Sequence, residues 1–400
     1  MAVMMADGSR GETLSDIGRD RRLVRALAAW FGTSRRQLPW RGEPGVARDP
    51  YLVLVSEVML QQTQVSRVLV KFPEFVRAFS TVRDLAAANE DDVLARWSGL
   101  GYYRRARMLH AAARMVMERF GGVVPREVLA LMELPGVGRY TAGAVASLAF
   151  GVSAPIVDGN VARVLIRIEG QDLSSGADGL AWAWPRAEAL VAACARAGVA
   201  AGVLNEALME LGAMVCTPSG PRCGGCPVRE ECGAHTLGMQ DSLPRPKVRA
   251  ARRRVRLDAL VVLDDSGRVL MEKQAEGALW SGLWQPPTAA ASKRALAAEL
   301  RVVLAEVGGG RATRIGVVER TLTHREVEFV VWGARVGGEG KGKKNRKDDR
   351  PPTLARGARV GVRWLHPWEF GGVGVSSACL ALLEVGLAGL RGAGPVRSGP

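Results

Sequence analysis

The sequence predicts a mostly α-helical N-terminal region followed by a smaller α+β domain. Through residues 23–248, apolar residues recur at three- and four-residue spacing, as they do on one face of an α-helix. After a segment rich in proline and arginine at 243–256, the spacing changes to the short apolar runs of β-strands. A length of 400 residues fits two or three domains of about 150 residues each. We therefore expect a flexible arm at 1–20, helices at 21–242, a linker at 243–256 and a second domain at 257–390.

Helical spacing is found in successive stretches of the N-terminal region, with glycine or proline between them. Residues 128–133 also fit a short helix, so 128–150 should contain two helices joined by a glycine-rich turn. The other helical stretches lie at 23–31, 51–70, 91–97, 106–120, 141–150, 161–168, 182–197 and 201–215.

The second domain combines strands with a helix. Two short apolar runs joined by the turn residues 264–267 predict a β-hairpin. Residues 314–336 predict two more strands, and 292–306 have the spacing of a helix. The polar, low-complexity residues 337–350 predict a mobile loop within this domain.

Charge and hydrophobicity limit the classes of partner. Lys and Arg number 55 against 40 Asp and Glu, a formal net charge of +15, so a nucleic acid is the first partner to test. No apolar stretch reaches the roughly 18 residues that span a membrane. Residues 1–20 lack the pattern of a secretory signal. We expect a monomeric cytoplasmic protein that is associated with the nucleoid and has no membrane partner. The cytoplasm is a reducing compartment, and there clustered cysteines bind a metal more often than they form disulfides.

Cysteines cluster at the end of the helical region. Their spacing is C-x6-C-x2-C-x5-C, formed by Cys216, Cys223, Cys226 and Cys232. Four thiolates this close together can hold either Zn²⁺ or a [4Fe–4S] cluster, and ligand softness does not choose between the two. Cys194 and Cys379 lie in apolar helical stretches and are expected in the core.

The turn between the helices at 128–133 and 141–150 is a candidate phosphate site. It contains Pro135, Gly136 and Gly138. The glycines let backbone N–H groups approach a ligand, and the helix N-terminus that follows favours an anion. A helix–hairpin–helix holds a DNA phosphate in this way without contacting bases. The alternative is an ordinary turn between helices.

Two carboxylates and a tyrosine are candidates for chemistry. Glu57 has apolar neighbours, and burial would raise its pKa so that it could act as a general acid near neutral pH; alternatively, it lies on a polar strip of its helix. Asp158 precedes a helical run, where it could cap the helix or face a positively charged sugar. Tyr140 directly follows the glycine-rich turn and is either part of the same site or a packed core residue.

Several motifs together resemble one family. They are SEVMLQQTQV, GLGYYRRARMLHAAA, LPGVGRYTAGA, VDGNVARVL and NEALMELGAMVCTP, with the cysteine spacing after them. In this order they resemble the MutY-type adenine DNA glycosylases of the endonuclease III superfamily, over roughly residues 23–243. Residues 255–390 are similar to the Nudix-like C-terminal domain of that family. The resemblance implies a helix–hairpin–helix six-helix module and an iron–sulfur module before the Nudix-like domain.

The resemblance also implies a reaction and the residues for it. The substrate would be double-stranded DNA with adenine mispaired with 8-oxoguanine, and the adenine would be flipped into a pocket before excision. Glu57 matches the acid that protonates adenine N7, and Asp158 matches the carboxylate that stabilises or traps the sugar cation. Tyr140 and Asn160 match their helpers, and the four cysteines match the ligands of a [4Fe–4S] cluster.

Further positions match family residues that hold the base or probe the mispair. Glu206 matches a second acidic residue of the adenine pocket. Since the bifunctional relatives carry a lysine nucleophile where this chain has Tyr140, we expect little or no strand cleavage by this chain. The segment Arg36, Leu38, Trp40 and Arg41 matches the adenine pocket, and Gln62, Thr63, Leu100 and Tyr102 match residues that probe or wedge the lesion pair.

The second domain offers a candidate reading loop. Thr323 and His324 lie between two predicted strands, where the family has a Phe-Ser-His-like loop that recognises 8-oxoguanine. Leu322 replaces the aromatic residue, and without the resemblance the segment could equally be an ordinary hairpin loop. Glu299 has few acidic neighbours, so the acidic Mg²⁺ site of a Nudix hydrolase is missing and we expect no hydrolysis by this domain.

The sequence disfavours three other functions. An endonuclease III-like glycosylase and lyase for oxidised pyrimidines is disfavoured by Tyr140 and by the second domain. A nucleotide pyrophosphohydrolase is disfavoured by the missing glutamates. A DNA-binding protein without catalysis is disfavoured by the presence of both Glu57 and Asp158.

Overall fold

A computed structural model describes residues 14–42, 47–246, 251–292, 295–337, 361–392 and 397–398. The chain divides into two compact units that are not contiguous in sequence. The first is made of Met1–Val76, Thr81–Arg83 and Ala111–Val248, and the second of Arg77–Ser80, Asp84–His110 and Arg249–Pro400. The second unit thus includes residues 77–80 and 84–110, which the sequence analysis assigns to the first domain.

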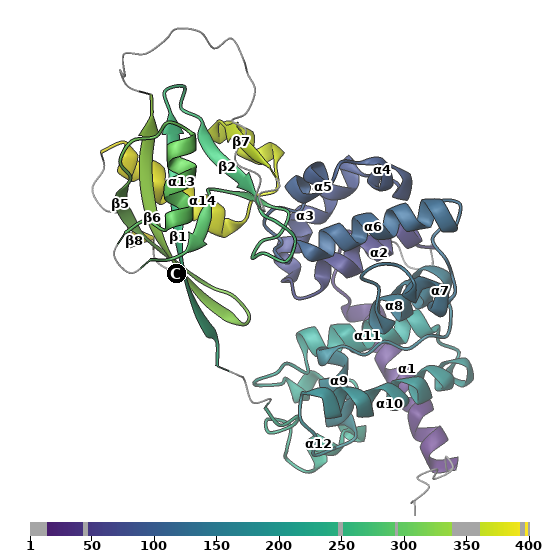
Figure 1. Ribbon diagram of the computed structural model, residues 1–400. Helices are drawn as coiled ribbons and strands as arrows, with labels where there is room; N and C mark the ends of the chain where they lie inside the picture. The colour runs from purple at the N-terminus through teal and green to yellow at the C-terminus, as the bar shows by residue number, and fades with distance from the viewer. Residues whose placement is uncertain are drawn as a thin grey trace, which may run out of the picture. The chain divides into compact units, whose positions relative to one another are not determined.

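The first unit is helical (Figure 1). α1 packs against α10 and α11, α2 against α8, and α9 against both α10 and α11. Its helices are α1 (Leu14–Ser34), α2 (Pro50–Leu60), α3 (Val65–Ala78), α7 (Val128–Met132), α8 (Arg139–Phe150), α9 (Gly159–Ile168), α10 (Ala177–Ala197), α11 (Ala201–Met214) and α12 (Gly233–Thr236), with short 3-10 turns η1 (Cys223–Gly225) and η2 (Arg229–Glu231). The second unit takes α5 (Glu90–Arg96), most of α4 (Val82–Ala87), the N-terminal part of α6 (Arg104–Arg119) and the last two residues of α3 from the helical region.

The segment 1–20 is not an unstructured arm throughout, because α1 already begins at Leu14. Two long-range ion pairs anchor this early turn. Asp20 is buried and accepts hydrogen bonds from Arg186, and Arg19 Nη1 lies 2.7 Å from Glu169 Oε2. Partners distant in sequence therefore extend the helix beyond the apolar pattern that predicted its start at residue 21.

The predicted helix at 51–70 is two helices. Asp49 accepts a hydrogen bond from the amide of Tyr51 and Pro50 occupies the first turn, so α2 begins with a strong start signal. The chain leaves the helix after Leu60, and Gln62 has a left-handed backbone with φ of 55°. The apolar spacing continues across this break, which is why periodicity alone does not locate it.

The second unit contains a mixed sheet with the strand order β3-β2-β1-β6-β5-β8. β1 and β6 pair in parallel over their full length, while β1–β2, β2–β3 and β5–β6 are antiparallel. β4 pairs with β1 and β7 with β2. The strands are β1 (Arg253–Asp264), β2 (Val269–Lys273), β3 (Trp284–Gln285), β4 (Thr288–Ala290), β5 (Thr313–Thr321), β6 (Arg325–Val336), β7 (Val362–Leu365) and β8 (Arg397–Ser398).

Helices cover both faces of this sheet (Figure 1). Along β1, alternate side chains point to opposite faces. Leu260 and Val262 pack with α13 (Ala298–Glu306), whereas Ala259 and Val261 pack with α14 (Ser377–Leu390). A 3-10 turn, η3 (Pro367–Gly372), precedes α14. Trp284 is buried in this core, as expected for a packing residue.

The linker prediction at 243–256 is wrong at its C-terminal end, because β1 begins at Arg253 and pairs there with β6. At its N-terminal end, the amide of Arg245 donates to the carbonyl of Leu173. The predicted loop at 337–350 lies outside the described residues after Gly337. Cys194 and Cys379 are buried, as predicted. Within the described ranges, no helix is long and apolar enough to cross a membrane.

Candidate active site

Glu57 lies on α2 and is 5% exposed. Burial is the main cause that raises the pKa of Glu57 from 4.5 to about 7, as the sequence predicted for an acid among apolar neighbours. A hydrogen bond with Tyr140 acts in the opposite direction and lowers the pKa, whereas the nearby carboxylates Glu206 and Asp158 raise it. About half of the Glu57 side chains are therefore protonated at neutral pH, so the group can donate a proton.

Asp158 is both a helix cap and a neighbour of Glu57. Its Oδ1 accepts a hydrogen bond from the amide of Val161 at 2.7 Å, which begins α9. Its Oδ2 accepts from Nδ2 of Asn160 at 3.2 Å. The charge of Asp158 raises the pKa of both Glu57 and Tyr140, which indicates that the three side chains share one site. The two interpretations left open by the sequence are thus compatible, because one carboxylate can cap α9 and also face the acid.

Tyr140 lies in the first turn of α8. Its hydroxyl is 3.1 Å from Sδ of Met209 and makes a hydrogen bond with Glu57. Burial, followed by the charges of Glu57 and Asp158, raises the pKa of Tyr140 well above its ordinary value. The phenol therefore stays neutral and serves as a hydrogen-bonding group rather than as a base.

Three arginines bind two glutamates on α11. Arg36 and Arg41 were predicted near the adenine pocket, and Arg48 was not predicted. Glu206 is bound by Arg48, with Nη2 to Oε2 at 2.6 Å, and by Arg41, with Nε to Oε1 at 3.2 Å. Glu210 is fully buried and accepts from Arg36 and Arg41, each at 2.8 Å. Burial opposes ionisation of Glu210, but these hydrogen bonds outweigh it and lower its pKa to about 2.

Sequence reasoning missed Arg48 and Glu210. The signal that could have found Glu210 is its spacing from Glu206, since residues four apart lie on the same helix face and both are buried. No local pattern marks Arg48, because its partner is distant in sequence. Both oxygens of Glu206 are engaged by arginines, so this carboxylate is a paired anion in the structure.

The remaining residues of the first unit that were predicted to form the adenine pocket or to probe the lesion pair differ in exposure. Trp40 is buried and meets Phe72 edge to face, with ring centroids 5.6 Å apart. Leu38 and Thr63 are partly buried, and Gln62 is exposed on the left-handed turn after α2. Gln61, which the sequence did not single out, donates to Oγ1 of Thr141 on α8 at 3.1 Å and so ties α2 to that helix.

The glycine-rich turn joins α7 to α8. Gly136 has φ of 78°, a conformation that favours glycine, and Gly138 is the N-cap of α8 without a side-chain hydrogen bond to the helix. Both glycines are exposed, and Pro135 is partly buried. The first-turn amides of α8 have no side chain from the N-cap as acceptor, so they are available to an anion.

Predicted lesion-probing residues of the second unit come together. Tyr102 is 47% exposed and has φ of 48°, and its hydroxyl lies 2.6 Å from Oγ1 of Thr323 in a hydrogen bond. His324 is exposed beside Thr323, in the tight turn between β5 and β6. Leu322 packs against the core of this unit. On the segment between α5 and α6, Leu100 is only 3% exposed, so Tyr102 rather than Leu100 is accessible there.

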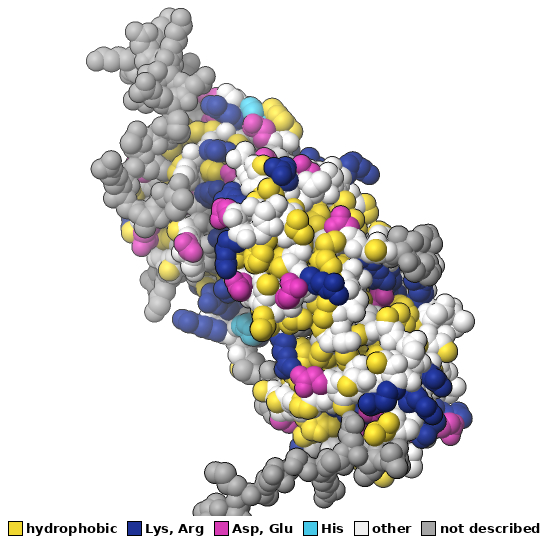
Figure 2. Space-filling view, turned by 90° about the vertical axis from the view of Figure 1, so that its right-hand side faces the viewer, with side chains coloured by type: hydrophobic (Ala, Val, Ile, Leu, Met, Phe, Trp, Pro, Cys, Tyr) yellow, Lys and Arg dark blue, Asp and Glu magenta, His cyan; other side chains and the backbone are white. Residues whose placement is uncertain are grey.

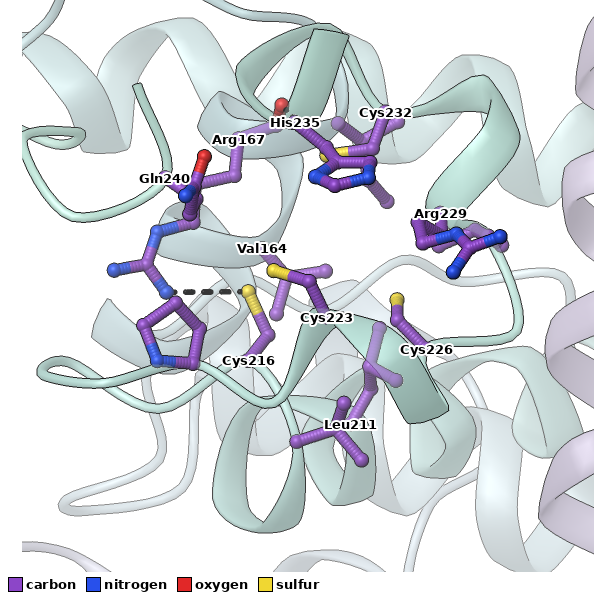
Figure 3. A pocket seen from close by; sticks show the side chains of 14 residues that line it. Val164, Arg167, Leu211, Cys216, Cys223, Cys226, Arg229, Cys232, His235 and Gln240 are labelled. Atoms are coloured by element: carbon purple, nitrogen blue, oxygen red, sulfur yellow. Dashed lines mark hydrogen bonds between the residues drawn. The ribbon is translucent and has the colours of Figure 1, made fainter. Parts of the chain in front are cut away.

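The four clustered cysteines line one pocket (Figure 3). All four are free thiols, and their loop follows α11 through η1 and η2. Apolar side chains such as Val164 and Leu211 form the rest of the wall. Among the described residues, no three potential ligands are close enough to bind one metal ion. The four cysteines nevertheless share one pocket, and thiolates are ligands of both zinc and iron–sulfur clusters.

A chain of hydrogen bonds leads from this pocket to Asp158. Arg163 on α9 donates from Nε to the carbonyl of Cys216 at 3.0 Å and from Nη2 to Oδ1 of Asn160 at 3.0 Å. Asn160 in turn donates to Asp158. The sequence did not single out Arg163, because arginine on an apolar helix has no local signal for burial.

Basic side chains are spread over the face seen in Figure 2, with hydrophobic and acidic side chains between them. Among the described residues of that face, the basic side chains form no single continuous patch.

Comparisons with known proteins give two family models and many relatives. Residues 55–177 match the HhH-GPD superfamily base excision DNA repair protein, and residues 258–385 match the NUDIX domain. A relative named adenine DNA glycosylase from Homo sapiens is 33% identical over 96% of this chain and 77% of its own length.

Two further comparisons are more local. Adenine DNA glycosylase from Mycobacterium tuberculosis (strain CDC 1551 / Oshkosh) is 46% identical over 50% of this chain and 64% of its own. A solved thermostable thymine-DNA glycosylase has a TM-score of 0.48 and 30% identity, and the match covers 55% of this chain and 98% of that one. The human relative is matched over most of both chains, and we conclude that this chain belongs to the family of adenine DNA glycosylases.

Proposed function

We propose that this chain excises adenine mispaired with 8-oxoguanine, or with guanine, from double-stranded DNA. The observation that carries the proposal is Glu57, an acid whose pKa is raised to about 7, in the same site as the carboxylate of Asp158. One neutral acid and one carboxylate are the arrangement that cleaves glycosidic bonds through an oxocarbenium-like transition state. Family membership supports adenine as the base that is removed.

The proposed reaction begins with adenine extruded from the duplex. Glu57 donates its proton to N7, and the bond between C1′ and N9 breaks with its electron pair going to the base. The carboxylate of Asp158 stabilises the cationic sugar or forms a transient bond to C1′, and water adds to C1′ to leave an abasic site. Tyr140 holds Glu57 through their hydrogen bond, and Asn160 holds Asp158.

Strand cleavage is not part of the proposed reaction. A lyase of this superfamily uses an amine to form an imine with the sugar, and the phenol of Tyr140 cannot do so. Phosphate binding is assigned to the exposed turn at Gly136 and Gly138, where the amides of α8 are available. Recognition of 8-oxoguanine is assigned to Thr323 and His324.

The proposed cofactor is a [4Fe–4S] cluster held by Cys216, Cys223, Cys226 and Cys232. Four thiolates could also bind zinc, and the resemblance of the cysteine spacing to that of the family favours the cluster. When bound, the cluster supplies a covalent cross-link between the loop after α11 and the adjoining turns. The residues of this pocket would then support Asp158 through Arg163 and Asn160.

Two conservative substitutions test the chemistry in single-turnover assays on an 8-oxoguanine:adenine duplex. Glu57→Gln removes the acid, and we expect adenine release to slow by about 10²-fold or more. Asp158→Asn keeps a residue that caps helices well and removes the charge, so release should slow by about 10²-fold while stability changes little. Glu74→Gln, on the exposed face of α3, is the matched control.

Strand breaks are scored before and after alkali, with a thymine-glycol duplex as a substrate control. We expect breaks at the abasic site only after alkali and no reaction with thymine glycol. Near-normal release by both variants would contradict the assignment of Glu57 and Asp158. Release of thymine glycol with strand cleavage would instead favour an endonuclease III-like enzyme.

A further inference from the structure

Arg167 is a buried cation beside the cysteine pocket. It lies on α9, and only 2% of it is exposed. Its Nη1 is 3.3 Å from Sγ of Cys216, the hydrogen bond drawn in Figure 3. Arg167 is therefore in contact with the side chain of a proposed cluster ligand, whereas Arg163 reaches only the backbone carbonyl of that residue.

The other hydrogen bonds of Arg167 all go to backbone carbonyls. Nε donates to Leu243 at 2.7 Å, Nη1 also donates to Thr217 at 2.7 Å, and Nη2 donates to Pro218 at 3.3 Å. These carbonyls fix the plane and position of the guanidinium on three sides. In this position one N–H bond of Nη1 points to the sulfur of Cys216.

No carboxylate is paired with this charge. Among the described residues, Arg167 has no ion-pair partner within 4.0 Å. Buried Arg41 of the same unit does have carboxylate partners, Glu206 and Glu210, whereas buried Arg163 is bonded to carbonyl and amide oxygens. Carbonyl dipoles orient a buried charge but do not neutralise it, and a buried ion without a counter-ion is costly. Cysteine thiolates in the pocket would supply the missing negative charge.

We propose that Arg167 is a positioning residue that sets the reduction potential and the stability of the cluster by hydrogen bonding to the Cys216 thiolate. This inference rests on the proposed cluster. Hydrogen bonds to ligating sulfur are among the features that determine the potential of an iron–sulfur cluster. A positive donor withdraws electron density from the thiolate, so it stabilises the reduced form and resists oxidative loss.

The same residue connects the cluster to the end of the helical unit. Leu243 precedes Pro244, and Arg245 is bound through its amide to the carbonyl of Leu173. Because one guanidinium bonds both Cys216 and the carbonyl of Leu243, displacement of the cysteine loop would also release this carbonyl. Arg167 therefore ties the cluster to the place where the chain leaves the first unit.

The test compares the full-length chain with three variants, each purified with its cluster. Arg167→Gln removes the charge, Arg167→Lys keeps the charge but loses the planar fork, and Arg229→Gln is the matched control. Arg229 lines the same pocket, but its side chain is 44% exposed and pairs with Glu230 rather than with a cysteine. The readouts are iron and sulfide content, the midpoint potential, and the rate at which the visible absorption of the cluster is lost in air.

We expect Arg167→Gln to have a lower midpoint potential than the unmodified chain and to lose its cluster several-fold faster. Arg167→Lys should fall between the two, and Arg229→Gln should match the unmodified chain. If Arg167→Gln does not fold, the comparison of Arg167→Lys with Arg229→Gln decides the matter by the same readouts. Unchanged potentials and loss rates would overturn the role of Arg167 and leave the cluster proposal intact. An unmodified chain that carries zinc instead of iron would overturn the cluster proposal, and this inference with it.

Discussion

The guanidinium of Arg48 binds both carboxylate oxygens of Glu206, with Nη1 to Oε1 at 3.1 Å and Nη2 to Oε2 at 2.6 Å. A parallel pair of this kind fixes the carboxylate in orientation as well as in charge. Glu206 raises the pKa of Glu57, the proposed acid. Arg48 therefore holds in place a carboxylate that affects the pKa of Glu57.

Arg48→Ala should therefore destabilise the protein by about 1 to 2 kcal/mol, because Glu206 is left buried with only Arg41 beside it. The value is below that of a fully buried pair, since the Arg48 side chain is 16% exposed and water can replace part of its contact. The measurement is the urea midpoint. Arg22→Ala, which removes an ion pair from an arginine that is 63% exposed, is the control and should leave the urea midpoint nearly unchanged.

A double-mutant cycle with Glu206→Gln separates the ion pair from other effects of the substitution. If Arg48 acts through Glu206, the two changes together should cost much less than the sum of the single changes. Additive effects would show that Arg48 stabilises the protein independently of this carboxylate.

Local patterns in the sequence predict some features of this site well. The burial of Glu57 follows from its apolar neighbours on one short helix, and the position of Tyr140 follows from the glycine-rich turn that begins α8. The short apolar run before the turn residues 264–267 predicts a strand, and β1 is present there. In each case the physical cause lies within a few residues of the feature.

Other features depend on partners that are far apart in the sequence. The positions of three arginine side chains are set by hydrogen-bond partners that are not local in sequence: Arg48, Arg163 and Arg167. Their partners are carboxylates, carbonyls and a sulfur, and no local pattern marks those pairings. The early start of α1 at Leu14 has the same cause, since Asp20 bonds with Arg186 of α10. The break between α2 and α3 interrupts an apolar pattern without a glycine or proline to signal it.

The raised pKa of Glu57 predicts a specific dependence of stability on pH. An acid with a raised pKa holds its proton in the folded state after the unfolded chain has lost it, here between 4.5 and about 7. The contribution of Glu57 to stability is therefore full below pH 4.5 and is lost as pH rises through about 7. The loss has an upper limit of about 3 kcal/mol, at 1.36 kcal/mol per pKa unit.

Glu57→Gln removes this titration because the amide stays neutral. We expect the variant and the unmodified chain to have similar urea midpoints at about pH 4, and the variant to be the more stable of the two at about pH 8. Glu74→Gln, exposed on α3, should follow the unmodified chain at both values. Parallel pH curves for Glu57→Gln and the unmodified chain would show that Glu57 is not desolvated in the folded protein.

The turn that carries Thr323 and His324 predicts how the second unit contributes to specificity. Thr323 bonds to the hydroxyl of Tyr102, and His324 is exposed beside it, so both can offer hydrogen bonds to a base. We expect Thr323→Ala combined with His324→Ala to reduce the preference for 8-oxoguanine over guanine opposite adenine by about tenfold, the effect of one or two lost hydrogen bonds. The measurement is the ratio of single-turnover rates at subsaturating enzyme on the two duplexes.

Two further variants show whether the effect belongs to these side chains. Tyr102→Phe removes the hydroxyl that binds Thr323 and keeps the ring, so it should lower the same preference by a smaller factor. Thr321→Ala changes an exposed residue of the same hairpin and should leave the ratio unchanged. If the double variant kept the full preference, recognition of 8-oxoguanine would have to be assigned to other residues. If it lost activity equally on both duplexes, the turn would support the structure of this unit rather than discriminate between the bases.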